Sequence, residues 1–61
     1  MLGSTKQRVV DSLLKLLDEK PMEDITISEL TQMAGISRMT FYRNYRGKED
    51  ILSEYFKDVL I

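Results

Sequence analysis

The segment Gly35–Lys48, with the sequence GISRMTFYRNYRGK, decides the fold that we predict for this chain. Ser37 is a favourable N-cap residue, because its hydroxyl can accept hydrogen bonds from the free amides of a first helical turn. No Pro or Gly interrupts the chain between Ser37 and Gly47, so we predict a helix over about residues 38–45. The segment carries four cations and no carboxylate: Arg38, Arg43, Arg46 and Lys48.

The predicted helix has an anchoring face and an outward face. At about 100° per residue, Phe41 and Tyr45 lie on one face as an i, i+4 pair. The other side chains suit the major groove of DNA, where Arg recognises guanine, Asn recognises adenine, and Thr and Met make methyl and apolar contacts. These outward and flanking residues are Arg38, Met39, Thr40, Tyr42, Arg43 and Asn44.

A second short helix is predicted immediately before this one. Thr26 and Glu29 have the spacing of a capping box, and apolar residues repeat at helical spacing after them, so we expect a helix over about residues 27–34. Gly35 stands where a left-handed residue commonly ends a helix, only three residues before the next one begins. Two helices joined by a short Gly-containing turn form a helix-turn-helix unit, whose second helix enters the major groove.

Longer amphipathic helices are predicted on both sides of this unit. Ser4 and Gln7 have capping-box spacing and Pro21 stops a helix, so we expect the first over about residues 5–20. The last is expected from about residue 48, and its apolar stripe is still in progress at the end of the sequence, as in a helix cut short at residue 61.

The predicted fold class is all-α. Residues 1–61 are expected to form one small helical bundle, a three-helix helix-turn-helix domain of the homeodomain-like kind plus the start of a fourth helix. A short linker is expected at residues 22–25. Ten residues are predicted to form the core or to anchor the helices: Leu13, Leu17, Ile27, Leu30, Ala34, Ile36, Phe41, Tyr45, Leu52 and Phe56.

Composition excludes several classes of function. The formal net charge is −1, but residues 37–48 hold four cations and no anion, so the basic patch is local. The chain has no Cys and no His, which removes thiolate metal sites and the usual nucleophiles and bases, so we expect no catalytic residue, metal or cofactor. No apolar run approaches the length of a membrane span, and a cytoplasmic location is the expectation.

The pattern resembles the DNA-binding domain of the tetracycline-repressor (TetR) family of bacterial transcription regulators, over about residues 9–56. The likeness depends on a run of Gly, aliphatic, Ser, Thr, aromatic, Tyr, aromatic, Lys and acid at fixed spacing. This sequence meets the run with Gly35, Ile36, Ser37, Thr40, Phe41, Tyr42, Tyr45, Lys48 and Glu49. Two positions in the second helix depart from it, Thr31 where Ala is usual and Ser28 where some relatives carry Arg.

The resemblance implies a division of roles. Phosphate contacts would come from Thr26, Ser37, Tyr42 and Lys48, and base contacts from Arg38, Met39, Thr40, Arg43 and Asn44. It also implies double-stranded DNA as the partner, and a repressor that binds a palindromic operator as a dimer in its full-length form. Dimerisation and effector binding would then belong to a C-terminal domain beyond this sequence.

Alternative interpretations remain open from the sequence alone. The four cations of residues 37–48 are also compatible with an ordinary solvated helix face. Tyr42 could be a single exposed aromatic residue without a role, and Met39 could do no more than fill space. The alternative function is a protein-interaction module that docks a partner through the apolar face of the last helix.

Overall fold

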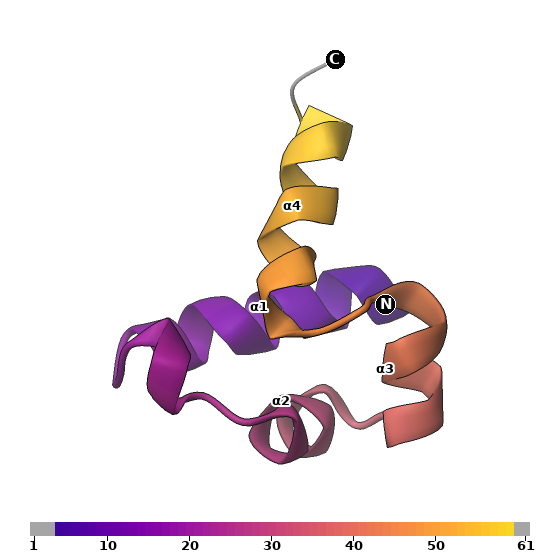
Figure 1. Ribbon diagram of the computed structural model, residues 1–61. Coiled ribbons are helices and arrows are strands. Elements are labelled where there is room, and N and C mark those ends of the chain that lie inside the picture. Colours follow the sequence, from indigo (N-terminus) through magenta and orange to yellow (C-terminus); the bar gives the residue numbers. More distant parts are fainter. Residues whose placement is uncertain (1–3, 60–61) are drawn as a thin grey trace.

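Four α-helices and one short 3₁₀ helix follow one another along the computed structural model, which describes residues 4–59 and the side chains of residues 4–57 (Figure 1). No strand occurs within these residues, so the all-α prediction is confirmed. The elements are α1 (Thr5–Leu17), η1 (Met22–Asp24), α2 (Ile27–Ala34), α3 (Arg38–Asn44) and α4 (Lys48–Val59).

α1 begins as predicted but ends earlier. The hydroxyl oxygen of Ser4 accepts from the Gln7 amide at 3.1 Å, whereas the Gln7 side chain donates to Asp11 at 2.9 Å and does not complete a capping box. The helix stops at Leu17, and the next residues form a turn in which the amides of Glu19 and Lys20 both donate to the Leu16 carbonyl. The prediction of a helix to about residue 20 was therefore too long by most of a turn.

The helix-turn-helix unit has the local geometry that its residues predict. Thr26 accepts from the Glu29 amide at 3.2 Å and the Glu29 carboxylate accepts from the Thr26 amide at 2.9 Å, a complete capping box. Gly35 has φ 72° and ψ 36°, in the left-handed region. The Ile36 amide donates to the Thr31 carbonyl at 3.0 Å, which satisfies one of the free carbonyls at the end of α2.

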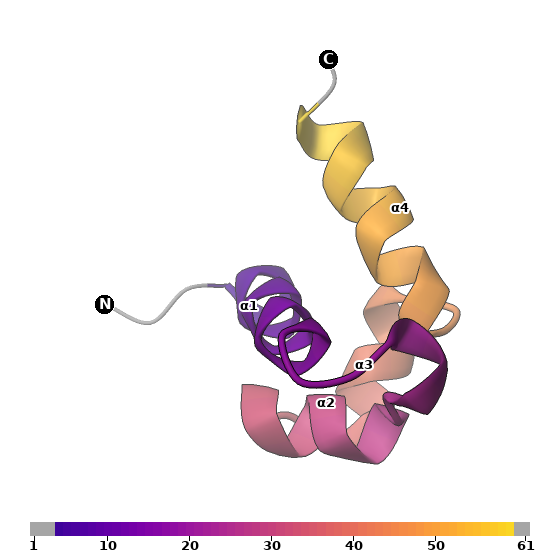
Figure 2. The ribbon, with the colours of Figure 1, turned by 90° about the vertical axis from the view of Figure 1, so that its left-hand side faces the viewer.

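The apolar core lies between α1 and the other three helices. α1 crosses α2 and also packs against the first half of α4, as the two perpendicular ribbon views show (Figures 1 and 2). Burial of these side chains is the main favourable term in so small a fold. The core consists of Val9, Val10, Leu13, Leu16, Ile25, Leu30, Ala34, Phe41, Tyr45 and Ile51.

The ten residues predicted to form the core differ in how far they are buried. Five of them are buried and four are half-buried against the core, the latter being Leu17, Ile27, Ile36 and Leu52. Phe56 is 49% exposed, so its assignment to the core was wrong, and its neighbour Tyr55 is 39% exposed. Both belong to the second half of α4, which stands clear of the other helices (Figure 2).

Two polar side chains are buried along with the core and both are satisfied. The Ser12 hydroxyl donates to the Arg8 carbonyl at 2.8 Å. The Thr31 hydroxyl donates to the carbonyls of Ile27 and Ser28 at 3.0 and 3.1 Å. Because its polar atom turns back onto its own helix, Thr31 leaves no unsatisfied group at the position where the family pattern has Ala.

Candidate nucleic-acid interface

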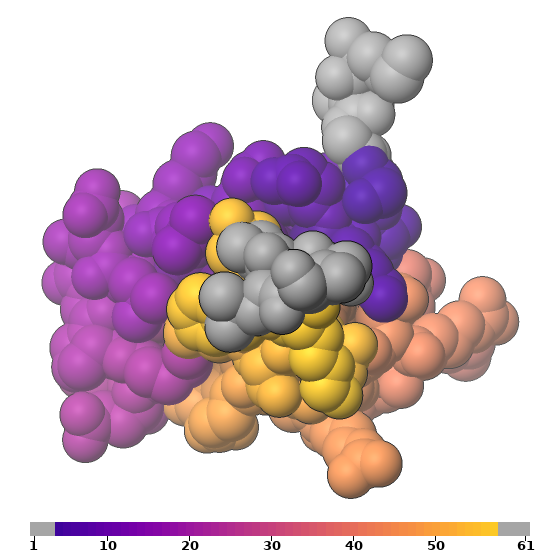
Figure 3. Space-filling view, turned by 90° about the horizontal axis from the view of Figure 1, so that it is seen from above, coloured from indigo at the N-terminus to yellow at the C-terminus, as the bar shows by residue number. Residues whose placement is uncertain are grey.

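α3 is fixed on the core by its two aromatic anchors. Phe41 is fully buried and Tyr45 is 3% exposed, and their ring centroids lie 5.4 Å apart. The buried pair determines which side of the helix faces water, because residues three and four apart share a face. In the space-filling view the segment that contains α3 forms one edge of the molecule, with side chains projecting from it (Figure 3).

The opposite side of α3 is the surface that we call the recognition face, defined as Arg38, Met39, Thr40, Arg43 and Asn44. Met39 is 68% exposed, the two arginines are also exposed, and Thr40 and Asn44 are half-buried. Tyr42, on its flank, is 52% exposed, and its ring lies nearly perpendicular to that of Phe41 at a centroid distance of 5.2 Å. The exposure follows the division into anchoring and outward residues that helical spacing predicts.

Hydrogen bonds order the polar part of this face. The Ser37 hydroxyl accepts from the Thr40 amide at 3.1 Å, the cap that its residue type predicts, and it also donates to the Thr40 hydroxyl at 3.0 Å. The Asn44 side-chain amide donates to the Thr40 carbonyl at 3.0 Å. One N–H and the oxygen of that amide group are left for other partners.

The two arginines of the recognition face have different partners. Arg38 donates to the Ser28 hydroxyl on α2, whereas Arg43 contacts the Met39 sulfur at 3.9 Å within its own helix. Neither forms an ion pair with any carboxylate among the described residues. Their charges are therefore not neutralised within this part of the chain, as an anion-binding surface requires.

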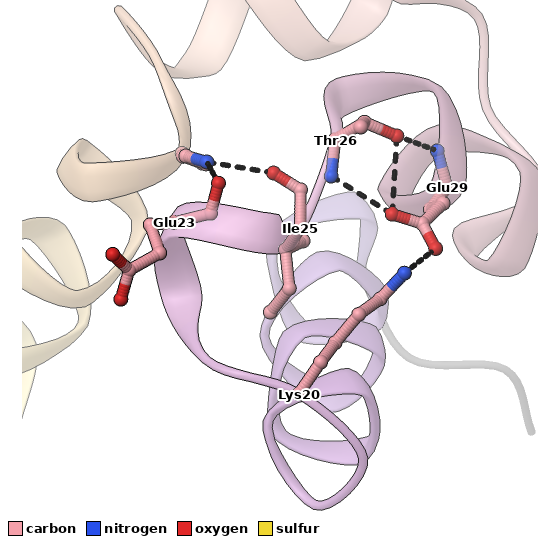
Figure 4. Close-up of polar contacts among 6 residues, drawn as sticks. Lys20, Glu23, Ile25, Thr26 and Glu29 are labelled. Carbon is pink, nitrogen blue, oxygen red and sulfur yellow. Dashed lines mark hydrogen bonds and ion pairs between the residues drawn. The ribbon is translucent and has the colours of Figure 1, made fainter.

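The four candidate phosphate-contacting residues differ in how far their polar groups are already engaged. The Thr26 hydroxyl lies inside the capping box and also donates to the Glu29 carboxylate at 3.2 Å. Lys48 donates to the carbonyl oxygens of Ile25 and Glu23 at 2.7 and 3.3 Å, which leaves one of its three ammonium protons for another acceptor (Figure 4).

An ion pair links the turn after α1 to the start of α2. Lys20, in the turn after α1, contacts the same Glu29 carboxylate that caps α2 (Figure 4). The hydrogen bond from Lys20, followed by the one from the Thr26 amide, lowers the pKa of Glu29 below its usual value. The carboxylate is thus held in its charged form, which is the form that accepts both bonds.

Three features of this region were not found by sequence reasoning. The bond between Arg38 and Ser28 and the pair between Lys20 and Glu29 link residues that are distant in sequence, so no local spacing indicates them. Ile25 was predicted to lie in a short linker and was not assigned to the core, but it is buried. The sequence did contain an indication that Ile25 is buried. An apolar residue just before the N-cap commonly packs on the fourth residue of the helix, which here is Leu30.

Metal and membrane sites find no support within the described part of the chain. No cluster of three or more potential metal-ligating side chains occurs there. None of its helices has both the length and the apolar character needed to cross a bilayer.

The sequence matches the family model of bacterial regulatory proteins of the tetR family over residues 9–55. This match contains α1, the helix-turn-helix unit and the start of α4. The chain belongs to the TetR family. It is accordingly a helix-turn-helix, DNA-binding domain of a transcription regulator, and the family likeness inferred from the residues is confirmed.

Several known proteins are similar to the chain. The HTH-type transcriptional regulator EthR of Mycobacterium tuberculosis is 46% identical over 37 residues, which cover 61% of this chain and 17% of EthR. The Tn10 TetC protein of Escherichia coli is 33% identical over 95% of this chain and 29% of its own length. AcrR of Shigella flexneri is 26% identical over 87% of this chain and 25% of its own length.

These matches have a limited extent. The chain spans less than a third of the length of each of these three relatives. EthR and AcrR are named as transcriptional regulators, and such regulators are generally not enzymes. No solved structure gave a significant match.

Proposed function

We propose that α3 enters the major groove of duplex DNA and that the recognition face contacts base edges. The observation that carries the proposal is the pair of exposed, unneutralised arginines, Arg38 and Arg43, on a helix anchored by Phe41 and Tyr45. A planar guanidinium can donate two parallel hydrogen bonds to the O6 and N7 atoms of guanine. Asn44 offers the matching amide chemistry for adenine, and Thr40 and Met39 suit the thymine methyl group.

The phosphate backbone is proposed to be held at the flanks of this face. Ser37 is the N-cap of α3 and Thr26 is the N-cap of α2, so free helical amides stand beside both hydroxyls. Tyr42 has an exposed ring that carries a hydroxyl, and Lys48 has one ammonium proton not engaged by carbonyls. Such contacts fix the register of the helix on the duplex without distinguishing sequences.

For the full-length regulator we propose a repressor that binds a palindromic operator as a dimer. The basis is family membership and the greater length of the relatives. Dimerisation and binding of an effector would be carried by a further helical domain that continues from α4. Two linked recognition helices gain affinity because the second contact becomes intramolecular, provided that their spacing matches the two half-sites.

Selection of bound sites from a pool of random duplexes tests the proposal. The selected duplex and a scrambled duplex of equal length are then titrated with the chain and with Arg43→Ala. We expect the substitution to weaken the selected duplex by about 1–3 kcal/mol and the scrambled one much less, because a base contact has been lost. Equal losses on both duplexes would remove Arg43 from the base-contacting set.

The second candidate function is a protein-interaction module, and the exposure of Tyr55 and Phe56 on α4 favours it. Two neighbouring exposed aromatic residues form an apolar surface that another protein could cover. This function does not exclude DNA binding, since the two surfaces belong to different helices. Salt separates the two, because contacts to phosphate weaken steeply with ionic strength and apolar contacts do not.

A further inference from the structure

A hydrogen bond joins the two helices of the helix-turn-helix unit on their exposed side. The Arg38 guanidinium donates through Nη2 to the Ser28 hydroxyl, ten residues earlier in the chain. Ser28 lies in the first turn of α2 and Arg38 is the first residue of α3, so the bond bridges the starts of the two helices. Arg38 is exposed and Ser28 is half-buried, which places the bond at the edge of the recognition face.

The second arginine of the recognition face lacks a comparable restraint. Among the described residues, the hydrogen bond of the Arg43 guanidinium is to the Met39 sulfur, at 3.9 Å and one turn away in the same helix. A thioether is a weak acceptor on a flexible side chain, so it restrains the guanidinium little. Arg38 is therefore oriented by a separate helix before any ligand binds, whereas Arg43 must be ordered by the ligand itself.

We propose that Ser28 is a positioning residue, which orients Arg38 and thereby strengthens the preference for one base pair. This inference rests on the proposed function, in which Arg38 faces the bases. The Ser28 bond uses one of the five N–H groups of the guanidinium, and the remaining four still include a parallel pair for guanine O6 and N7. An arginine held in its binding geometry loses less conformational freedom when the contact forms.

The experiment uses the duplex selected from a random pool, together with duplexes in which each base pair is changed singly. Arg38→Ala first identifies the base pair that Arg38 contacts, as the position where preference is lost. Ser28→Ala is expected to reduce preference at that same base pair by about threefold to tenfold, the range that loss of one hydrogen bond produces. Preference at the base pair assigned to Arg43 should stay unchanged, since Arg43 does not contact Ser28.

Two further variants separate positioning from a direct or merely structural role. Ser28→Thr keeps the hydroxyl and should retain the preference. Ser28→Ala combined with Arg38→Ala should behave as Arg38→Ala alone, because the two residues act as one unit. Thermal melts of all four proteins establish that each is folded, and a similar melting temperature for Ser28→Ala is expected.

The proposal and the function on which it rests fail in different ways. If Arg38→Ala abolishes preference at one base pair and Ser28→Ala leaves it intact, the positioning role is overturned and the proposed function stands. Uniform weakening of all duplexes by Ser28→Ala would also overturn it, because that result indicates a contact to the backbone. If Arg38→Ala changes no base preference, the role of Arg38 in base contact fails and the positioning role fails with it.

Discussion

The ammonium group of Lys48 donates a 2.7 Å hydrogen bond to the carbonyl oxygen of Ile25, 23 residues earlier in the chain. Lys48 is the first residue of α4, and Ile25 is a buried residue that directly precedes the N-cap of α2. A second bond reaches the Glu23 carbonyl at 3.3 Å. One side chain therefore ties the start of α4 to the segment that leads into the helix-turn-helix unit.

Lys48→Met should lower both stability and DNA affinity. Loss of the ammonium leaves the Ile25 carbonyl without this donor, which we expect to reduce the free energy of unfolding by about 0.5–1.5 kcal/mol in urea titrations. Selected and scrambled duplexes should be weakened alike, because a phosphate contact carries no sequence information.

The matched control for this substitution is Lys57→Met. Among the described residues Lys57 pairs with Glu54, at 3.3 Å on the surface of α4, so its loss should change stability by less than about 0.5 kcal/mol. If Lys48→Met is as stable as the unsubstituted chain, the two hydrogen bonds from Lys48 to carbonyl oxygens contribute nothing to stability. A loss confined to the selected duplex would instead make Lys48 a base contact.

Gly35→Ala should destabilise the turn. The residue has φ 72°, which costs a side chain with a Cβ atom about 1–2 kcal/mol. A Cβ atom there would also lie 3.2 Å from Nη2 of Arg8, although a flexible side chain can move away. Thermal or urea unfolding measures the loss.

Two substitutions control for this effect. Gly35→Asn should be milder, because Asn tolerates the left-handed region better than Ala does. Gly47→Ala should change stability little, since a Cβ atom there would meet the flexible end of the Glu49 side chain at 3.6 Å and the φ of Gly47 is not positive. Equal stability of Gly35→Ala and the unsubstituted chain would contradict the left-handed turn.

Local chemistry explains how much of the fold could be predicted from the sequence. Thr26, Gly35 and Ser37 act on amides and carbonyls within a few residues of themselves, so residue type and spacing were enough to place α2, the turn and α3. Phe56 could not be placed in this way. Helical spacing indicates which residues share an apolar face, but only the packing of other helices determines how far along α4 that face is covered.

Phe41→Ala and Phe56→Ala should therefore differ sharply. Phe41 is fully buried, and its removal should cost about 3–5 kcal/mol, comparable with the whole stability of a domain of this size. Phe56 is 49% exposed, so the same change should cost less than about 1 kcal/mol. Circular dichroism and urea titration of the two proteins make the comparison, and similar losses would mean that α4 packs more closely than described.

The start of α2 should weaken in acid because of Glu29. Its pKa is lowered in the folded chain by the hydrogen bonds from Lys20 and from the Thr26 amide. A carboxyl group whose pKa is lower in the folded state stabilises that state above its unfolded pKa, and the contribution is lost as the pH falls through the lower, folded value. The loss is therefore expected on acidification below about pH 4.5, near the ordinary pKa of Glu.

Glu29→Gln provides the comparison for this prediction. Glutamine keeps the shape of the capping box but does not titrate, so the stability difference between the two proteins isolates the carboxylate. That difference should be present at pH 7 and should shrink as the pH falls below about 4.5. A constant difference across this range would show that the carboxylate has the same pKa in the folded and unfolded chains.

The candidate site was less accessible to sequence reasoning than the fold. Helical spacing separated the outward residues of α3 from Phe41 and Tyr45, and their exposure agrees with that division. Spacing could not show that Arg38 is bonded to Ser28 or that Lys48 is engaged by the Ile25 carbonyl. Both bonds cross between helices, so they depend on how α2, α3 and α4 are packed together.

Binding to DNA should weaken steeply with salt if α3 and its flanks contact phosphates as proposed. A single domain that contacts four or five phosphates releases a similar number of counterions, which gives a slope of about −4 for log K against log salt. Affinity at physiological ionic strength should be weak for one such domain, near the ~10⁻⁴ to 10⁻⁶ M typical of nonspecific binding.

Lys48→Met should make the slope of log K against log salt less negative by about one unit, since one phosphate contact is removed. Lys57→Met, on a helix surface away from the recognition face, should leave the slope unchanged. Titrations of one duplex over a series of salt concentrations decide the matter, and a slope near zero would favour an apolar contact through Tyr55 and Phe56 instead.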